Sequence, residues 1–171
     1  ATHNEPFVVA IPGYGEGSMA PGVASYPQAF QAAHHLNLAH GRTVQLYRQM
    51  GLPGQIGIVL NLATFIPRTD APEDVAAAGR MEDFINNLFL DPIFKGTYPQ
   101  GLMDWVGEMA PEIQDGDLAV TSQPVDFLGI NYYFSQIVGY NPHGLLKLNS
   151  EPNIDSGWGM TPKGWGICPS Q

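Results

Sequence analysis

The residues best suited to chemistry lie at the start of the sequence, in the segment Thr2-His3-Asn4-Glu5-Pro6. The carboxyl group of Glu5 can protonate a leaving oxygen, and the amide of Asn4 can hydrogen-bond a hydroxyl next to the reacting carbon. A carboxyl and an amide held side by side, where a strand runs into a loop, are what the cleavage of a glycosidic bond needs. Glu5 and Asn4 are therefore the first candidate site residues.

Further polar residues follow two short apolar runs. Asn61 comes directly after the run at 56–60, and Asn131 and Tyr133 come after the run at 125–130. A short apolar run without alternation is typical of a strand buried on both faces of a parallel sheet. The carboxyl ends of such strands are where barrel enzymes keep their catalytic groups. Asn61 fits a strand-end cap equally well, so we do not count it as catalytic.

The elements that would position these residues alternate between strands and helices. The predicted order is a strand end at 1–7 broken by Pro6, a Gly- and Pro-rich loop at 11–27, a helix at 26–50 capped by Ser25, a strand at 55–61, a helix from Asp70 to Asp91-Pro92, a short helix after Tyr98-Pro99, a strand at 125–130 and an irregular tail at 134–171. This alternation predicts an α/β fold with a parallel sheet.

The helix that follows Asp70 has its own sequence signals. Asp70 with Glu73 three residues later forms a capping-box pattern, which predicts the start of the helix. Its inner face is predicted from four apolar residues at helical spacing, namely Val75, Ala78, Ile85 and Leu88.

Composition and charge restrict the partners. The chain has 171 residues, 44% of them apolar, and 7 Lys+Arg against 16 Asp+Glu give a formal net charge of −9. So few cations do not make the basic footprint that nucleic acid and anionic membrane surfaces attract. We therefore expect no nucleic-acid partner and no membrane partner, while neutral or cationic ligands remain open.

The charged fraction is unusually low. Charged residues make up 13% of the chain, whereas roughly a quarter is typical of a globular domain. A loop-rich domain and the inner part of a larger fold both fit this composition, and we favour the second. Uncovered strand edges and apolar helix faces would then allow the chain to self-associate.

The compartment is predicted only indirectly. The single cysteine, Cys168, cannot form an intramolecular disulfide, and no signal peptide is visible, so the cytoplasm is favoured. The sequence begins inside a motif and not at a methionine, and we expect the native N-terminus to be missing.

Two other chemistries are suggested by residue type but fail on spacing. His34, His35 and His40 do not have the i, i+4 spacing with an intervening Glu that a helical zinc site uses, so we interpret them as packing and hydrogen-bonding residues. Gly13, Gly15 and Gly17 lack the third glycine of a dinucleotide-binding loop, because position 18 is Ser. We expect neither a metal nor an organic cofactor.

Several segments together resemble the family 1 glycoside hydrolases, the β-glucosidase and β-galactosidase family. The similar segments, in the order of the family, are Thr2-His3-Asn4-Glu5-Pro6, the Gly-rich loop from Gly13 to Gly22, the helix from Gln31 to Gly41, Leu90-Asp91-Pro92 with Gly96 and Tyr98-Pro99, the strand from Asp126 to Tyr133, and Gly164-Trp165 with Pro169. Each segment alone is a weak signal, but six in the same order make coincidence an inadequate explanation.

The resemblance implies a fold and a set of roles. The chain would be part of a (β/α)8 TIM barrel, from about the end of strand four through strand six and the following loop. Glu5 would be the general acid/base and Asn4 would bind the hydroxyl beside the anomeric carbon. Tyr133 would hydrogen-bond the nucleophilic carboxylate, with Asn131 nearby. The family retains anomeric configuration through a covalent intermediate, and the substrate would be a small β-glucoside or oligosaccharide.

The sequence also departs from the family. The family's nucleophile lies in a Thr-Glu-Asn-Gly motif that this sequence does not contain, and Met19 and Phe7 stand where His and Trp are usual. We therefore expect residues 1–171 to form one partial barrel domain, incomplete at both ends, with the nucleophile outside it. Two alternatives stay open: a non-catalytic or inactive sugar-binding fragment, and a relative acting on β-galactosides or 6-phospho-β-glucosides.

Overall fold

The computed structural model describes residues 1–154 and 157–169. The chain divides into two units, one made of Ala1–Asn61 and Asn87–Asn131 and the other of Leu62–Asn86 and Tyr132–Gln171. Strands β1 (Gly57–Pro67) and β2 (Phe127–Tyr140) both begin in the first unit and end in the second. The sheet order is β1-β2-β3, with β3 at Leu148–Pro152. The α/β class predicted from the sequence is confirmed.

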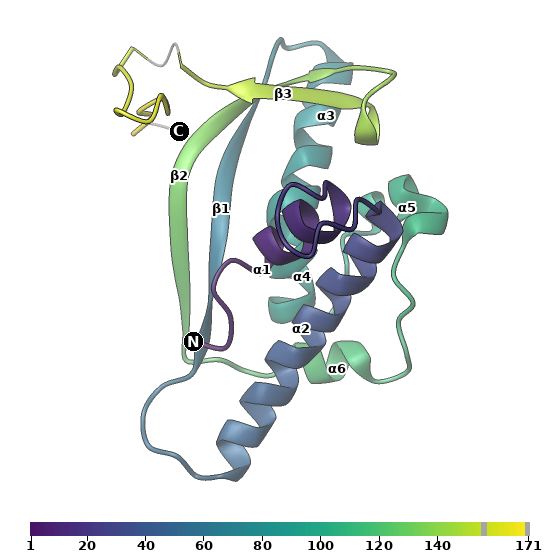
Figure 1. Ribbon diagram of the computed structural model, residues 1–171, viewed down its shortest axis with the longest axis vertical. Helices are drawn as coiled ribbons and strands as arrows, with labels where there is room; N and C mark the ends of the chain where they lie inside the picture. Colours follow the sequence, from purple (N-terminus) through teal and green to yellow (C-terminus); the bar gives the residue numbers. More distant parts are fainter. Residues whose placement is uncertain (155–156, 170–171) are drawn as a thin grey trace. The chain divides into compact units, whose positions relative to one another are not determined.

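The first unit is built around one long helix, α2 (Tyr26–Gln49), which Figure 1 shows in dark blue. The other helices of this unit are α1 (Pro6–Val8), the π-helix η1 (Val9–Gly15), α4 (Leu88–Phe94), α5 (Gln100–Val106), the 3-10 turn η3 (Gly107–Met109) and α6 (Asp117–Thr121). Helix α2 packs against η1, α4 and α6. Gly41 of α2 faces the backbone carbonyl of Val120 so closely that a Cβ would collide with it.

The sequence signals for α2 are confirmed. Ser25 is the N-cap in an extended conformation, and Pro27 lies in the first turn, where its missing N–H costs nothing. Gly51, just past the end, has a φ of +60°, which glycine adopts without steric cost. Of the five residues that recur at helical spacing in this segment, Ala29, Ala33 and Val44 are buried, whereas Leu36 and Tyr47 are only half-buried. Within the described ranges, no helix has the length and apolar character to cross a membrane.

The strands of the first unit run parallel, as predicted. Asn4 forms a parallel bridge with Val59 of β1. On the other side of β1, Gly57 lies against Phe127 and Val59 lies against Gly129, so both strands advance in the same direction. Side chains at Ile56, Ile58 and Leu60 are buried, which confirms the buried run predicted at 55–61.

The second unit contains α3 (Pro72–Glu82), the short helix η4 (Leu145–Lys147) and β3; the π-helical turn η2 (Asp83–Asn87) follows α3. Strand β3 pairs antiparallel with β2, from Gln136↔Pro152 to Tyr140↔Leu148. An ion pair of 2.7 Å joins Arg68 to Glu151, and Nε of Arg80 donates to the carbonyl of Leu146 at 2.8 Å.

Several predicted element boundaries are wrong. The segment 11–27 is not all loop, because η1 continues to Gly15. Strand β1 does not stop at Asn61, and β2 continues to Tyr140, so the start of the predicted irregular tail is a strand paired with β3. The short helix α6 is a further element that has no counterpart in the prediction. Antiparallel pairing with β3 extends β2, and residues 136–140, which make this pairing, do not form a continuous apolar run that the sequence could signal.

The details of the helix after Asp70 also differ. Its N-cap is Ala71, with Pro72 as the first helical residue, and no side-chain cap is formed. The carboxylate of Asp74 instead accepts from Thr69 Oγ1 at 2.7 Å and from the backbone N–H of Tyr140 at 2.7 Å. Val75, predicted on the inner face, is 50% exposed, and Ile130 of the predicted buried strand is 57% exposed.

Candidate active site

The Asn4-Glu5 segment is held in place by strand β1. The backbone N–H of Glu5 donates to the Val59 carbonyl at 2.9 Å, and the N–H of Val59 donates to the His3 carbonyl at 3.0 Å. One residue earlier, the N–H of Thr2 donates to the Gly57 carbonyl at 2.7 Å. The segment therefore continues the parallel sheet up to Glu5, and helix α1 begins at once with Pro6.

Glu5 has a left-handed backbone, with φ 52° and ψ 57°. This region is uncommon for a residue with a Cβ and costs about 1–2 kcal/mol relative to a right-handed conformation. Such conformations persist only where the surrounding structure over-determines them, and they cluster at functional sites. Here the left-handed residue is the junction between a strand and a helix, and it is also the candidate acid/base.

Asn131 of β2 connects the two candidate residues. Its Nδ2 donates to Oε1 of Glu5 at 2.7 Å and to Oδ1 of Asn4 at 3.1 Å. In a regular strand, successive side chains point to opposite faces, so Asn4 and Glu5 would point apart. The left-handed turn at Glu5 instead lets both side chains contact one amide. The structure thus brings together three of the four residues proposed from the sequence.

Tyr133, the fourth residue, lies in the second unit. Its side chain is 48% exposed, and its ring centroid is 5.6 Å from that of Trp165. Tyr132, which the strand pattern also delivers, is 45% exposed and its hydroxyl lies 3.1 Å from Oγ1 of Thr64.

Two histidines, the half-buried His3 and the fully buried His40, lie next to Asn4 and Glu5. Nδ1 of His40, on α2, is 2.6 Å from Oγ1 of Thr2. Burial, and secondarily the repulsion between the two rings when both are protonated, lower the pKa of His40 from its usual 6.5 to about 4. Burial also lowers the pKa of His3. Both rings are therefore neutral at pH 7.

His34 belongs to a separate buried network. Its Nε2 lies 3.0 Å from Oδ2 of Asp117, and its Nδ1 lies 3.0 Å from the hydroxyl of Tyr98. That hydroxyl also accepts from Nδ2 of Asn37, which in turn contacts the Leu88 carbonyl. The hydrogen bond from His34 is the main reason that the pKa of Asp117 is below its usual value. The network joins α2 to α4 and α6, which confirms a packing and hydrogen-bonding role for His34.

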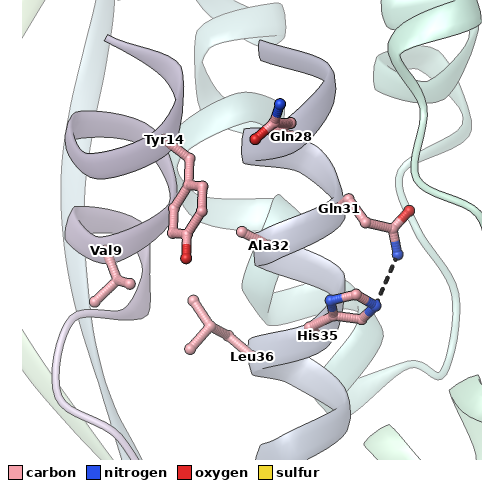
Figure 2. Close-up of a pocket in the computed structure, with 7 residues that line it drawn as sticks. All are labelled: Val9, Tyr14, Gln28, Gln31, Ala32, His35 and Leu36. Atoms are coloured by element: carbon pink, nitrogen blue, oxygen red, sulfur yellow. Dashed lines mark hydrogen bonds between the residues drawn. The ribbon is translucent and has the colours of Figure 1, made fainter. Parts of the chain in front are cut away.

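A pocket of about 380 Å³ lies on the first unit between η1 and α2 (Figure 2). Ala32 lies between Tyr14 on one side and Gln31 with His35 on the other (Figure 2). Gln28 and Leu36 lie at the two ends of the pocket (Figure 2). None of its lining residues is Glu5, Asn4 or Asn131. Within residues 1–154 and 157–169, no cluster of three or more His, Cys, Asp or Glu side chains could hold a metal ion.

Comparison with known proteins defines the family. The model of Glycosyl hydrolase family 1 matches residues 1–165. Beta-glucosidase A from Thermotoga maritima is 38% identical in an alignment 168 positions long that covers 95% of this chain and 38% of that protein. The 6-phospho-beta-glucosidase GmuD from Bacillus subtilis is 35% identical in an alignment 177 positions long, gaps included, that covers 97% of this chain and 38% of that protein. The chain belongs to glycoside hydrolase family 1.

Solved structures give the same result. The family 1 β-glucosidase from Exiguobacterium antarcticum superposes with a TM-score of 0.91 at 35% identity, over 98% of this chain and 38% of that chain. The β-glucosidase from Thermotoga maritima in complex with deoxynojirimycin superposes with a TM-score of 0.87 at 38% identity, over 97% of this chain and 37% of that chain. The chain thus spans about two fifths of the length of these relatives.

Proposed function

We propose that this chain supplies the acid/base half of a retaining β-glucosidase site, within a (β/α)8 barrel of which it forms the part from the end of strand four through strand six. Glu5 protonates the glycosidic oxygen as the bond to the sugar breaks. After the glycosyl-enzyme intermediate has formed on a second carboxylate, Glu5 accepts a proton from the attacking water. No step in this reaction requires a metal or an organic cofactor.

One observation carries this proposal: the amide of Asn131 contacts both Glu5 and Asn4 at the carboxyl ends of parallel strands. Such a contact limits the rotation of the Glu5 side chain, and a positioned proton donor is what general acid catalysis requires. Asn4 accepts the hydrogen bond from Asn131 through its Oδ1 atom, so its Nδ2 group can donate to a sugar hydroxyl. We assign Asn131 to the same sugar and Tyr133 to the nucleophilic carboxylate.

The substrate we favour is a terminal β-D-glucosyl residue. The relatives from Thermotoga maritima, Acetivibrio thermocellus and Agrobacterium are named β-glucosidases. A 6-phospho-β-glucoside is the second candidate, because the relative GmuD carries that name at 35% identity. A β-galactoside remains the third.

The proposal is testable by segment exchange. The segment of Thermotoga maritima β-glucosidase A that matches this chain would be replaced by residues 1–171, so that the remaining barrel supplies the second carboxylate. We expect hydrolysis of an aryl β-glucoside with retention of anomeric configuration. For a substrate whose leaving group needs protonation, Glu5→Gln should lower the rate of hydrolysis by at least about a thousandfold. The same assay with aryl β-galactoside and aryl 6-phospho-β-glucoside distinguishes the three substrates.

Two controls make the result specific. Glu73→Gln removes an exposed carboxylate in the first turn of α3 and should leave the rate unchanged. Adding azide to Glu5→Ala should restore turnover of a substrate with a good leaving group, because azide attacks the intermediate without general-base help. An exchanged enzyme in which Glu5→Gln has parental activity would refute the assignment.

A further inference from the structure

We propose that His40 is a positioning residue for Glu5: through the hydroxyl of Thr2, it fixes the short segment that presents Asn4 and Glu5 to Asn131. This inference rests on the proposed role of Glu5, but the contact it concerns is measurable without any turnover. It adds a buried helix residue, 35 positions from Glu5 in the sequence, to the groups on which the site depends.

The first argument is the strain at residue 5. A glutamate with φ 52° needs contacts that hold it in that conformation. On its C-terminal side, buried Pro6 begins helix α1. On its N-terminal side, backbone hydrogen bonds to Gly57 and Val59 hold the segment on β1. A side-chain contact from α2 adds a second, independent hold on this segment.

The second argument is the contact itself. His40 is fully buried, and its Nδ1 lies 2.6 Å from Oγ1 of Thr2, a short hydrogen bond. This bond joins the segment directly to α2. Helix α2 is itself fixed by its packing against η1, α4 and α6.

The third argument is that two ring nitrogens near Thr2 are buried without a hydrogen-bond partner among the described residues. They are Nε2 of His40 and Nε2 of His3. An unsatisfied buried polar group destabilises the folded chain, and a leucine of similar size would avoid this cost at position 40. The His40 ring is also uncharged at neutral pH, because burial lowers its pKa to about 4. The hydrogen bond to Thr2 therefore accounts for a histidine at this buried position.

The test compares substitutions that change only the hydroxyl. Thr2→Val keeps the shape of the side chain and removes Oγ1, whereas Thr2→Ser keeps the hydroxyl. Hydrogen–deuterium exchange of the 171-residue chain, followed by mass spectrometry, reports on peptides covering residues 1–9 and 127–135. We expect Thr2→Val to increase exchange about tenfold or more in these peptides, and Thr2→Ser to restore it to within about twofold of the parent.

Matched variants keep the test decisive. Thr43→Val is the control: it removes the hydroxyl of a threonine on α2, which donates to the Ala39 carbonyl at an exposed position. It should leave the exchange of both peptides unchanged. His40→Asn retains a polar atom where Nδ1 stood and should increase exchange less than His40→Leu. If Thr2→Val exchanges like the parent, or if Thr2→Val and Thr43→Val loosen the whole chain equally, the positioning role is overturned. If the segment-exchanged enzyme shows Glu5-dependent turnover while Thr2→Val leaves hydrogen–deuterium exchange unchanged, the positioning role of His40 is refuted and the proposed function stands.

Discussion

The amide Nδ2 of Asn131 lies 2.7 Å from Oε1 of Glu5, although the two residues are 126 positions apart in the sequence. The contact joins the end of the first strand segment to β2, and it also includes Asn4 at 3.1 Å. A hydrogen bond to a carboxylate is stronger than one between neutral groups. The relationship therefore ties the position of the candidate acid/base to a residue that neighbours it only after folding.

Asn131→Leu should weaken catalysis in the segment-exchanged enzyme. The variant keeps the approximate volume but removes the donor to Glu5 and Asn4. Hydrogen bonds to charged groups contribute about 1.5–3 kcal/mol, so we expect kcat/KM to fall about 10- to 100-fold. Steady-state kinetics with an aryl β-glucoside measure the effect. A fall of less than twofold would show that Asn131 does not orient Glu5.

Tyr98→Phe should destabilise the first unit. The hydroxyl bonds Nδ1 of His34 and accepts from Nδ2 of Asn37, and its loss leaves buried polar atoms unpaired. We expect the free energy of unfolding to fall by about 1–3 kcal/mol. Urea titrations followed by circular dichroism give the value. Tyr47→Phe is the control, because that hydroxyl donates to the Pro53 carbonyl at an exposed position, and it should change stability by less than about 1 kcal/mol.

Stability should fall as the pH is lowered from about 6.5 to 4. The pKa of His40 is about 4 in the folded chain and 6.5 for an unperturbed histidine, so the unfolded chain binds more protons in this window. The loss attributable to His40 approaches about 3 kcal/mol at the acid end, and His3 shifts in the same direction. Urea titrations across this range should show a shallower dependence in His40→Leu. His143→Gln, at an exposed position, should keep the parental dependence.

The 171-residue chain alone should not hydrolyse an aryl β-glucoside at a measurable rate. Retaining hydrolysis needs two cooperating carboxylates, and the sequence contains no Thr-Glu-Asn-Gly motif to supply the second. Removing one member of a cooperating set typically costs several orders of magnitude. Prolonged incubation with a fluorogenic substrate provides the sensitivity. Turnover that Glu5→Gln abolishes would contradict this expectation.

The chain should also self-associate in solution. Strand β3 is an edge strand with mostly exposed residues, and Ile130 of β2 exposes 57% of its surface. Unpaired edges and exposed apolar side chains both promote association. Sedimentation velocity over a range of concentrations should show a rising weight-average mass, which Ile130→Lys should reduce. A single compact monomer at all concentrations would be evidence against this prediction.

The sequence predicts those features that depend on local signals. Helix α2 begins after an N-cap serine with proline in its first turn and ends before a glycine, so its bounds are accurate to about one residue. The apolar run at 56–60 likewise identifies a buried part of β1. The rule that polar residues gather at the carboxyl ends of parallel strands correctly brings Asn131 to Asn4 and Glu5.

Features that depend on tertiary contacts are not predictable in this way. The left-handed conformation of Glu5 has no signal in a sequence where glycine or asparagine would be the expected residue. The bond between Thr2 and His40 spans 38 positions and follows no local pattern. Strand β2 is longer than its apolar run because residues 136–140 pair with β3, and Val138 among them is also buried.

The left-handed turn at Glu5 sets two requirements against each other at one position. The backbone there would accommodate glycine with less strain, and only the carboxylate can move a proton. Variants selected for expression or thermal resistance alone would therefore be free to discard the glutamate. An engineering campaign on this scaffold must screen for bond cleavage at every round, because folding by itself does not preserve this residue.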